Sequence, residues 1–254
     1  MTAVLSLGIA AAGGSELAAR IAPAAEAAGL HALWVNDTPG HDAPALLAVA
    51  ADVTERLVLA TGVLRVDRRT ASDIAAAAAA LPQDRLVLGI GSGQLRVGAV
   101  DAVTDAAADL RAATRARVVV GALGPRMRRA GAAASDGLLL SWLTPEAAAA
   151  QTAEAHELAP RAHVALYVRA ATDPAAVAAL EEETARYAGY PAYARNFARL
   201  GVDPATTVIR PAELRERIAA YRGAADEVAL RMITPHGGVD EHLRFIDAVA
   251  EAVA

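Results

Sequence analysis

Cysteine and lysine are both absent from this sequence of 254 residues, and aromatic side chains make up only 4% of it. Without cysteine the chain has no thiol nucleophile, no disulfide bond and no thiolate metal ligand. Without lysine it cannot form a Schiff base with a carbonyl substrate, which excludes the mechanism of many aldolases. None of the serines lies in a Gly-x-Ser-x-Gly motif, so the sequence also lacks a nucleophile elbow.

The charge balance argues against polyanionic partners. The 24 basic residues are all arginines, and they are outnumbered by 29 acidic residues, which gives a net charge of −5. An acidic chain of this kind is not expected to bind nucleic acid or an anionic membrane. No apolar run approaches the roughly 20 residues that span a bilayer. The start MTAVLSLGIA resembles a strand rather than a signal peptide, so we expect a cytoplasmic protein with a small-molecule substrate.

Apolar strand-like segments alternate with helix-like segments along the whole chain, a pattern typical of a parallel sheet with crossover helices. We expect strands at 4–9, 31–35, 57–64, 86–90, 117–121, 137–140, 163–168 and 227–232. We expect helices at 16–28, 70–81, 100–115, 145–158 and 239–253. Eight strand–helix units in one domain, residues 1–254, favour a (β/α)8 TIM barrel over the alternative of an open doubly wound sheet.

Residues 174–221 interrupt this alternation with two or three additional helices before the eighth strand. Three of the five tyrosines and one of the two phenylalanines fall between residues 187 and 197. Such a cluster suits either a cover over a ligand or ordinary packing between helices, and we favour helix packing.

Small and polar residues gather where the strands end, which is where the ligands of parallel α/β folds bind. RLVLGIGSG at 85–93 has glycine at every second position, but Gln94 follows it, so it is not a dinucleotide fingerprint. We expect these glycines to admit a ligand. Gly62, inside an apolar strand, indicates a bulge or a close ligand contact. GALGPRM at 121–127 opens a helix and suits a phosphate, although a simple turn explains it too. Asp37 suits either a hydrogen bond to a ligand or the cap of a helix near Pro44.

Taken in order, four segments identify a resemblance: LAARIAPAAEAAGLHALWVND, RLVLATGVLRVDRRTASDIAAAAAAL, DRLVLGIGSG and VVVGALGPRMRRAGAAASDGLLLSWLTPE. Residues 4 to about 147 resemble the luciferase-like monooxygenase superfamily, and most of all its oxidoreductases that use the deazaflavin coenzyme F420. The resemblance implies a luciferase-like TIM barrel. The segment after its fourth strand is shortened, and extra helices precede its eighth strand.

The resemblance also implies which residues bind the cofactor. The set is Asp37, Gly62, Val63, Arg65, Ser92, Gly93, Gly124, Pro125, Arg126 and Met127. Within it, Asp37 contacts the deazaflavin, and Gly62-Val63 forms a bulge with a non-prolyl cis peptide behind the ring. The loop at 92–93 passes beside the cofactor, and the segment 124–127 holds its phosphate. The glycines of RLVLGIGSG then make room for a deazaflavin.

Two residues depart from the sugar-phosphate dehydrogenase branch of this superfamily. That branch has a proton-donating histidine where this chain has Thr38, and a glutamate where it has Gln94. An amide cannot serve as a general acid or base. In addition, only 24 residues separate Gly93 from Val118, where the family usually inserts a longer segment that builds the substrate pocket. The chemistry of that branch is therefore not transferred to this chain.

His41, shortly after the second strand, is the candidate catalytic proton donor, because an imidazole titrates near neutral pH. His236, after the eighth strand, is a second candidate, and a role as an ordinary surface histidine is the alternative for both. Trp142, after the sixth strand, is expected to line the pocket.

We therefore expect an F420-dependent oxidoreductase that transfers a hydride between the deazaflavin and a small organic substrate, with no metal. The alternatives are an FMN-dependent luciferase-like monooxygenase, a barrel that binds a flavin or deazaflavin without turnover, and an unrelated phosphate-binding barrel. Because relatives often dimerise, a homodimer is also an expectation.

Overall fold

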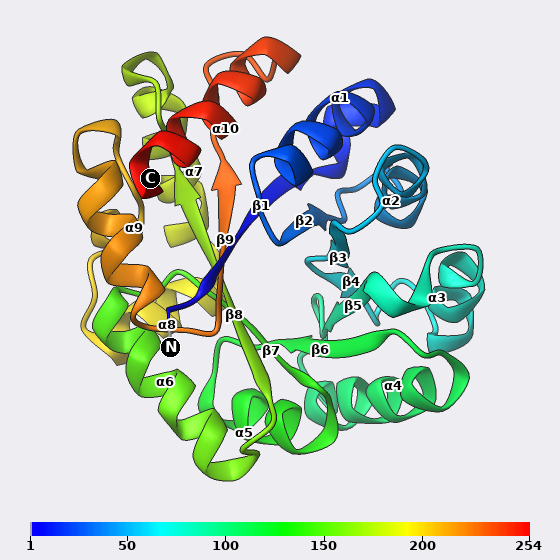
Figure 1. Ribbon diagram of the computed structural model, residues 1–254. Coiled ribbons are helices and arrows are strands. Elements are labelled where there is room, and N and C mark those ends of the chain that lie inside the picture. Colours follow the sequence, from blue (N-terminus) through cyan, green and yellow to red (C-terminus); the bar gives the residue numbers. More distant parts are fainter. Residues whose placement is uncertain (1) are drawn as a thin grey trace.

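The computed structural model describes residues 2–254, and its strands form one closed parallel sheet (Figure 1). The strands are β1 Val4–Ala10, β2 Ala32–Asn36, β3 Val58–Thr61, β4 Leu64–Arg65, β5 Leu86–Gly91, β6 Arg117–Gly121, β7 Gly137–Ser141, β8 His163–Ala170 and β9 Glu227–Met232. They follow one another around the sheet, which closes through pairing of β3 with β5. β3 and β4 occupy one barrel position between them. The predicted (β/α)8 barrel is therefore confirmed, and the doubly wound alternative is wrong.

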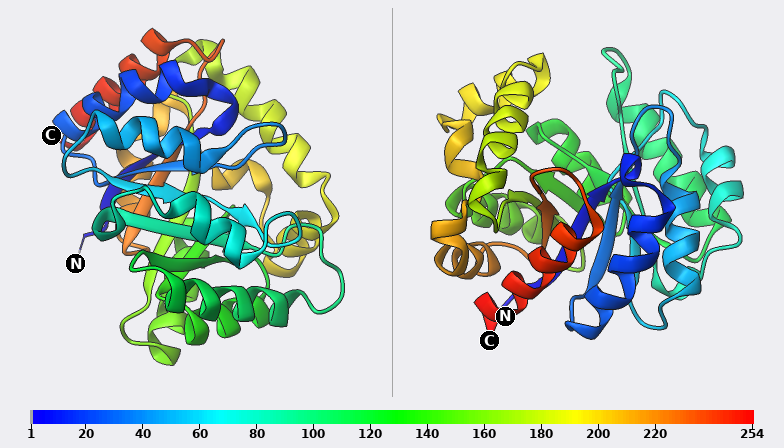
Figure 2. Two further views of the ribbon diagram at one scale, coloured as in Figure 1. Left: turned by 90° about the vertical axis from the view of Figure 1, so that its right-hand side faces the viewer. Right: turned by 90° about the horizontal axis from the view of Figure 1, so that it is seen from above.

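Helices surround this barrel (Figure 2). They are α1 Gly14–Ala27, α2 Ala43–Asp52, α3 Ala71–Ala78, α4 Ala99–Ala113, α5 Pro125–Ala134, α6 Pro145–Leu158, α7 Val177–Ala188, α8 Pro191–Leu200, α9 Leu214–Arg222 and α10 Val239–Val253. The helices expected before the eighth strand are α7, α8 and α9. A loop of only seven residues separates β5 from α4, in agreement with the shortened segment predicted after the fourth strand of the barrel. Within residues 2–254, no helix combines the length and apolar character needed to cross a membrane.

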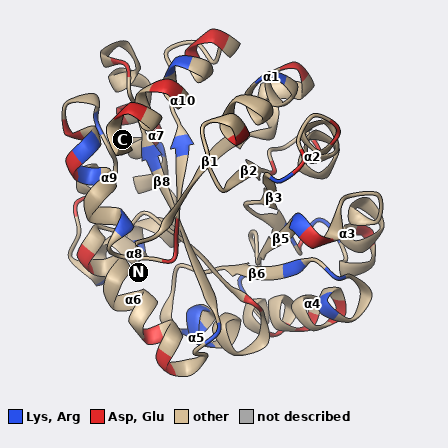
Figure 3. Cartoon of the chain, viewed as in Figure 1, with Lys and Arg blue, Asp and Glu red and all other residues tan. Residues whose placement is uncertain are grey.

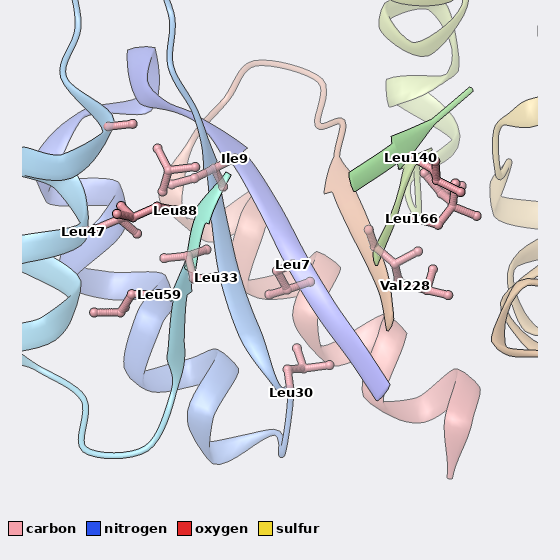
Figure 4. Close-up of a cluster of buried hydrophobic side chains, with 14 of the residues drawn as sticks. Leu7, Ile9, Leu30, Leu33, Leu47, Leu59, Leu88, Leu140, Leu166 and Val228 are labelled. Atoms are coloured by element: carbon pink, nitrogen blue, oxygen red, sulfur yellow. The ribbon is translucent and has the colours of Figure 1, made fainter. Parts of the chain in front are cut away.

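Two apolar layers hold the barrel together, because successive side chains of a strand point to opposite faces. The outer layer lies between strands and helices and includes Leu7, Leu33 and Leu59, all fully buried (Figure 4). The inner layer fills the barrel and includes Trp34 and Leu139. The many alanines allow the helices to pack closely against the strands, and burial of both layers is the main stabilising contribution.

The third barrel strand is broken, although the sequence predicted a continuous strand at 57–64. β3 ends at Thr61 and β4 begins at Leu64, and the Gly62–Val63 peptide bond between them is cis. The Gly62 N–H donates to the carbonyl of Val35 at 2.9 Å, and the side-chain amide of Asn36 donates to the Gly62 carbonyl. These bonds to β2 and its end hold the chain in the bulge that the glycine and the resemblance both predicted.

A buried carboxylate lies at the opposite end of the barrel, where the strands begin. Glu227 is 1% exposed and accepts hydrogen bonds from Ser6 Oγ at 2.5 Å and Trp34 Nε1 at 2.6 Å. Its other oxygen lies 2.8 Å from His163 Nε2. Burial alone raises the pKa of the Glu227 carboxyl, but these hydrogen bonds, with His163 first, lower it below its usual value. The group therefore joins three further strands in its ionised form.

Replacement of Glu227 tests this network. Glu227→Ala leaves two buried donors, Ser6 and Trp34, and the half-buried His163 without their acceptor, and is expected to cost about 3–5 kcal/mol of unfolding free energy. Glu227→Gln keeps the size and one acceptor oxygen and should cost about 1–3 kcal/mol. Because the folded-state pKa is lowered, the stabilisation is present above the unfolded value of about 4.3 and is lost as pH falls through the folded one. Urea unfolding from about pH 2 to pH 7 measures this, and equal stability of wild type and Glu227→Ala at pH 7 would show that the network does not stabilise the fold.

Candidate functional site

A chain of hydrogen bonds crosses the carboxyl mouth of the barrel. Tyr167, on β8, is 2% exposed and its hydroxyl donates to Asn36 Oδ1 at 2.9 Å. The amide of Asn36 in turn donates to the Gly62 carbonyl. The Tyr167 ring lies against β1 at Gly8, where a Cβ atom would overlap it. The position of the bulge is thus set by side chains from two other strands.

The bulge forms a small apolar floor at this mouth. The methyl groups of Val63 lie between two glycines, and a Cβ atom at Gly91 or Gly121 would meet them at 2.8 Å and 2.9 Å. Gly62 lies against Leu139 and Trp34 in the same way. Val63 itself remains partly exposed. The floor therefore spans several barrel positions and presents backbone and aliphatic carbon to whatever lies above it.

The glycines of RLVLGIGSG make room for the protein's own chain, a use of these glycines that we did not predict. A Cβ atom at Gly89 would overlap the Thr61 carbonyl, and one at Gly91 would press on Val63. Gly93 has a φ of 60°, and a Cβ atom there would overlap the Asp67 carboxylate. All three contacts are with the third barrel strand or the loop after it. The contact of Ser92 and Gly93 with a cofactor remains a prediction.

The loop after β4 is fixed by an ion pair. Arg65 Nη2 lies 2.6 Å from Asp67 Oδ2, and the Gln94 N–H donates to the same oxygen at 3.0 Å. The hydrogen bond from Arg65 holds the pKa of the Asp67 carboxyl below its usual value. Arg65, expected to contact the cofactor, therefore also ties the third strand to the loop of Ser92 and Gly93.

Asp37 takes part in one of the two roles left open by the sequence, the start of a helix, and its contact with a ligand remains a prediction. Its carboxylate lies 3.4 Å from Arg69 Nη2, and it accepts from the Ala43 N–H, at the start of α2, at 3.4 Å. It thus contributes to the start of α2 while standing at the mouth of the barrel. The neighbouring Thr38 hydroxyl is buried and has no hydrogen-bond partner among the described residues. A buried polar group without a protein partner is what a site for a polar ligand contains.

The segment 124–127 forms the start of α5, and its role in binding a phosphate remains a prediction. Gly124 is the N-cap residue without a side-chain cap, and Pro125 occupies the first turn, so the next N–H groups, of Arg126 and Met127, lack helical partners. Arg199, on α8, donates to the Leu123 carbonyl at 2.9 Å and reaches to within 3.6 Å of the Cβ position of Gly124. Burial lowers its pKa somewhat. Sequence reasoning missed Arg199, because it lies in a distant helix without a motif.

Trp142 does not line a pocket, contrary to our expectation. It is 1% exposed, and the guanidinium carbon of Arg169 lies 4.2 Å from the centroid of its ring. The same carbon lies 4.7 Å from the centroid of the Tyr187 ring. Phe197 packs edge-on against Trp142. The aromatic cluster is therefore helix packing around an internal arginine, as we favoured. Because Arg169 pairs with Glu183 on α7 at 3.1 Å, this unit anchors the extra helices to β8.

His41 and His236 both stand in exposed loops after strands, β2 and β9 respectively. The His41 N–H donates to the Thr38 carbonyl at 3.0 Å, which places it on the same loop as Asp37. The His236 N–H donates to Glu241 at 2.9 Å. Among residues 2–254, no three acidic, histidine or cysteine side chains lie close enough to hold a metal ion.

Comparison with known proteins confirms the resemblance. Residues 9–102 match the family model of the luciferase-like monooxygenases. This range includes β2, the bulge and the loop after β5. No curated protein matches the chain in sequence.

Solved structures show the same fold over nearly the whole chain. The F420-dependent tetrahydromethanopterin reductase from Methanopyrus kandleri is similar with a TM-score of 0.75 and 16% identity, covering 99% of this chain and 98% of that one. An F420-dependent secondary alcohol dehydrogenase gives a TM-score of 0.72 at 15% identity, covering 98% and 99%. The FMN-bound oxygenating constituent of 3,6-diketocamphane monooxygenase from Pseudomonas putida gives 0.69 at 13%, covering 98% of both chains. The fold is therefore that of luciferase-like oxidoreductases.

Two glycine variants test the packing of the loops at the mouth. Gly93 and Gly98 have similar φ values, 60° and 65°, but only Gly93 has neighbours within 4 Å of its Cβ position. Gly98→Ala should cost about 1 kcal/mol for the left-handed conformation alone. Gly93→Ala should cost about 1–3 kcal/mol more, because it displaces the Asp67–Arg65 pair. Urea unfolding of the two variants measures the difference, and equal losses would show that the pair is not held against Gly93.

Proposed function

We propose that this luciferase-like barrel binds coenzyme F420 at its carboxyl mouth and acts as an oxidoreductase on a small organic substrate. The observation that carries the proposal is the combination of an apolar floor at Gly62–Val63 with an uncapped helix start at Gly124. Only two residues separate Gly121, which contacts Val63, from Gly124, so the two features lie within about 10 Å along the chain. F420 carries a flat ring and, on a short chain, a phosphate. Binding it requires an apolar surface for the ring and an anion-binding group for the phosphate at about this separation.

The residues present fit such a group in their chemistry. The floor offers aliphatic carbon, which suits a ring, and the helix start offers N–H groups and the positive end of a helix dipole, which suit a phosphate. Arg126 and Arg199 add charge at this end, and Arg199 pairs with no carboxylate among the described residues. The unpartnered Thr38 hydroxyl adds a polar contact at the other side of the floor.

Each residue then has a defined task. Gly62 and Val63 support one face of the ring, and Asn36 holds them through the Gly62 carbonyl. Asp37 accepts a hydrogen bond from the polar edge of the cofactor while Arg69 keeps it oriented. When bound, F420 supplies a two-electron carrier that exchanges a hydride with the substrate. The protein supplies orientation and exclusion of water.

His41 exchanges a proton with the substrate oxygen in this proposal. It stands on the loop of Asp37, three residues beyond Thr38, which occupies the position of the proton donor in the sugar-phosphate branch. Because the His41 loop is exposed, the imidazole keeps contact with solvent and can be reprotonated between turnovers.

The glycine-proline turn of ALGPRM favours F420 over FMN. The second candidate is an FMN-dependent monooxygenase, which the FMN-bound neighbour supports. Fluorescence titration of the purified protein with F420 and with FMN separates them. Tighter F420 binding is expected, and a preference for FMN would transfer the protein to the monooxygenase alternative. A cytoplasmic location and a homodimer remain part of the proposal.

A third candidate, a barrel that binds the cofactor without turnover, is favoured by Thr38 and Gln94. F420 binding combined with no reduction or oxidation of the cofactor by any member of a broad alcohol and ketone panel would favour this candidate.

Removing the charge of Arg199 tests the phosphate site. Arg199→Met loses a charge-assisted hydrogen bond worth about 1.5–3 kcal/mol, so F420 should bind roughly 10- to 100-fold more weakly. Arg195→Met, an exposed position on the same helix α8, is the matched control and should leave the affinity unchanged. Equal F420 affinity of Arg199→Met and wild type would place the phosphate elsewhere.

Histidine variants test the proton transfer. His41→Ala should lower kcat about 10²- to 10⁴-fold with little change in F420 affinity, because a general acid acts in the transition state. His236→Ala is the comparison and should retain kcat. The opposite pattern would assign the proton to His236.

A further inference from the structure

Arg231 is an inward-facing arginine at the mouth of the barrel. On β9, Glu227 and Ala229 point into the barrel, so by alternation Arg231 does as well. In the sheet it lies opposite Gly8 on β1 and Arg169 on β8. Figure 3 shows basic positions toward the ends of both β8 and β9. Two adjacent strands thus bring two positive charges to the same edge.

These two arginines differ in their partners. Arg169 is 4% exposed and is neutralised by Glu183, and the other oxygen of Glu183 pairs with Arg186 at 3.4 Å. Arg231, by contrast, is only half-buried and forms no ion pair among the described residues. It donates to the carbonyl of its neighbour Met232. The Arg231 guanidinium is therefore available to an anion from outside the chain.

An open cavity of about 270 Å³ adjoins this arginine, between α7, the end of β9 and the start of α10. Its walls combine aliphatic residues with charged ones: Ala179, Met232, Ile233, Glu182, Glu183, Arg186, Arg231 and His242. His242 is 5% exposed, and burial lowers its pKa, so it adds little positive charge at neutral pH. Among the charged residues that line the cavity, Arg186 and Arg231 equal Glu182 and Glu183 in number. Glu183 is already shared by Arg169 and Arg186, so Arg231 is the lining arginine without an ion pair among the described residues.

We propose that this cavity binds the carboxylate of a small organic acid, with Arg231 as its counter-ion and the wall of Ala179 and Ile233 against its carbon skeleton. A single arginine without an ion pair suits a monoanion better than a phosphate, and the exposed Glu182 beside it disfavours a dianion. Arginine binds a carboxylate through two parallel N–H groups. The cavity lies beside Tyr167, which holds the bulge, because the Tyr167 ring covers Gly8 and Arg231 is in register with Gly8.

One part of this proposal rests on the proposed function, namely that the bound acid is the substrate of the barrel. In that case the substrate is a carboxylic acid that carries a second, redox-active group. The anion site itself is tested without cofactor.

The probe is benzoate, with benzamide as its neutral counterpart and inorganic phosphate as the alternative anion, at constant ionic strength. The protein holds three methionines, of which Met232 lines the cavity and Met127 lies at the start of α5. The methionine methyl groups are labelled with ¹³C and observed by NMR, and their resonances are assigned with the variants Met127→Leu and Met232→Leu. Benzoate should shift the Met232 resonance saturably and leave the Met127 resonance unchanged. Benzamide should shift neither. Equal shifts with benzamide, or stronger binding of phosphate through Arg231, would overturn the assignment.

Variants complete the test by calorimetry. Arg231→Met should weaken benzoate binding at least 10-fold, and Arg231→Lys should retain most of it. Arg244→Met, exposed on α10 outside the cavity, should change nothing. Unchanged affinity of Arg231→Met would overturn the proposal. Binding of F420 is read separately from the Met127 resonance: benzoate binding through Arg231 without any F420 binding would refute the proposed function and leave the anion site standing.

Discussion

The hydrogen-bond chain from Tyr167 through Asn36 to the Gly62 carbonyl sets the geometry of the barrel mouth. It links β8, the end of β2 and the break between β3 and β4 across the opening, so side chains from two strands fix one peptide group of a third. The position of the Gly62 peptide group in turn places the Val63 side chain between Gly91 and Gly121, where it fits because these two residues lack side chains. The floor on which a ring would rest is therefore determined by the interior of the barrel and not by the loops.

The two ends of the barrel use polar groups in different ways. At the end where the strands begin, Glu227 is fully satisfied by Ser6, Trp34 and His163, and this end serves stability. At the mouth, the Thr38 hydroxyl has no hydrogen-bond partner and Arg231 has no ion pair among residues 2–254, and the first N–H groups of α5 have no helical partner. These groups are available to a ligand at the carboxyl face, where ligands of such barrels bind.

Most of the barrel could be predicted from the sequence, because apolar strands and alanine-rich helices alternate with strong local signals. The break at Gly62 was visible as a glycine in an apolar strand. The neighbours of the glycines in RLVLGIGSG could not be predicted, because a glycine that faces a ligand and one that faces Thr61 or Asp67 look the same in sequence.

Long-range partners could not be predicted either. Arg199 reaches the start of α5 from a helix 75 residues later in the chain, counted from Gly124, and no spacing links the two. Trp142 was expected in the pocket because it follows a strand, but Arg169 and the extra helices bury it. Arg231 was not singled out at all, since its lack of a counter-ion appears only once the sheet register is known.

A crystal structure of the protein with F420 would show directly where the cofactor binds. We expect the deazaflavin ring against Gly62 and Val63, with the cofactor's phosphate within hydrogen-bond distance of the Arg126 and Met127 N–H groups and near Arg199. A well-ordered cofactor whose ring lies away from the bulge, or whose phosphate is bound at Arg231 and not at the start of α5, would contradict this expectation.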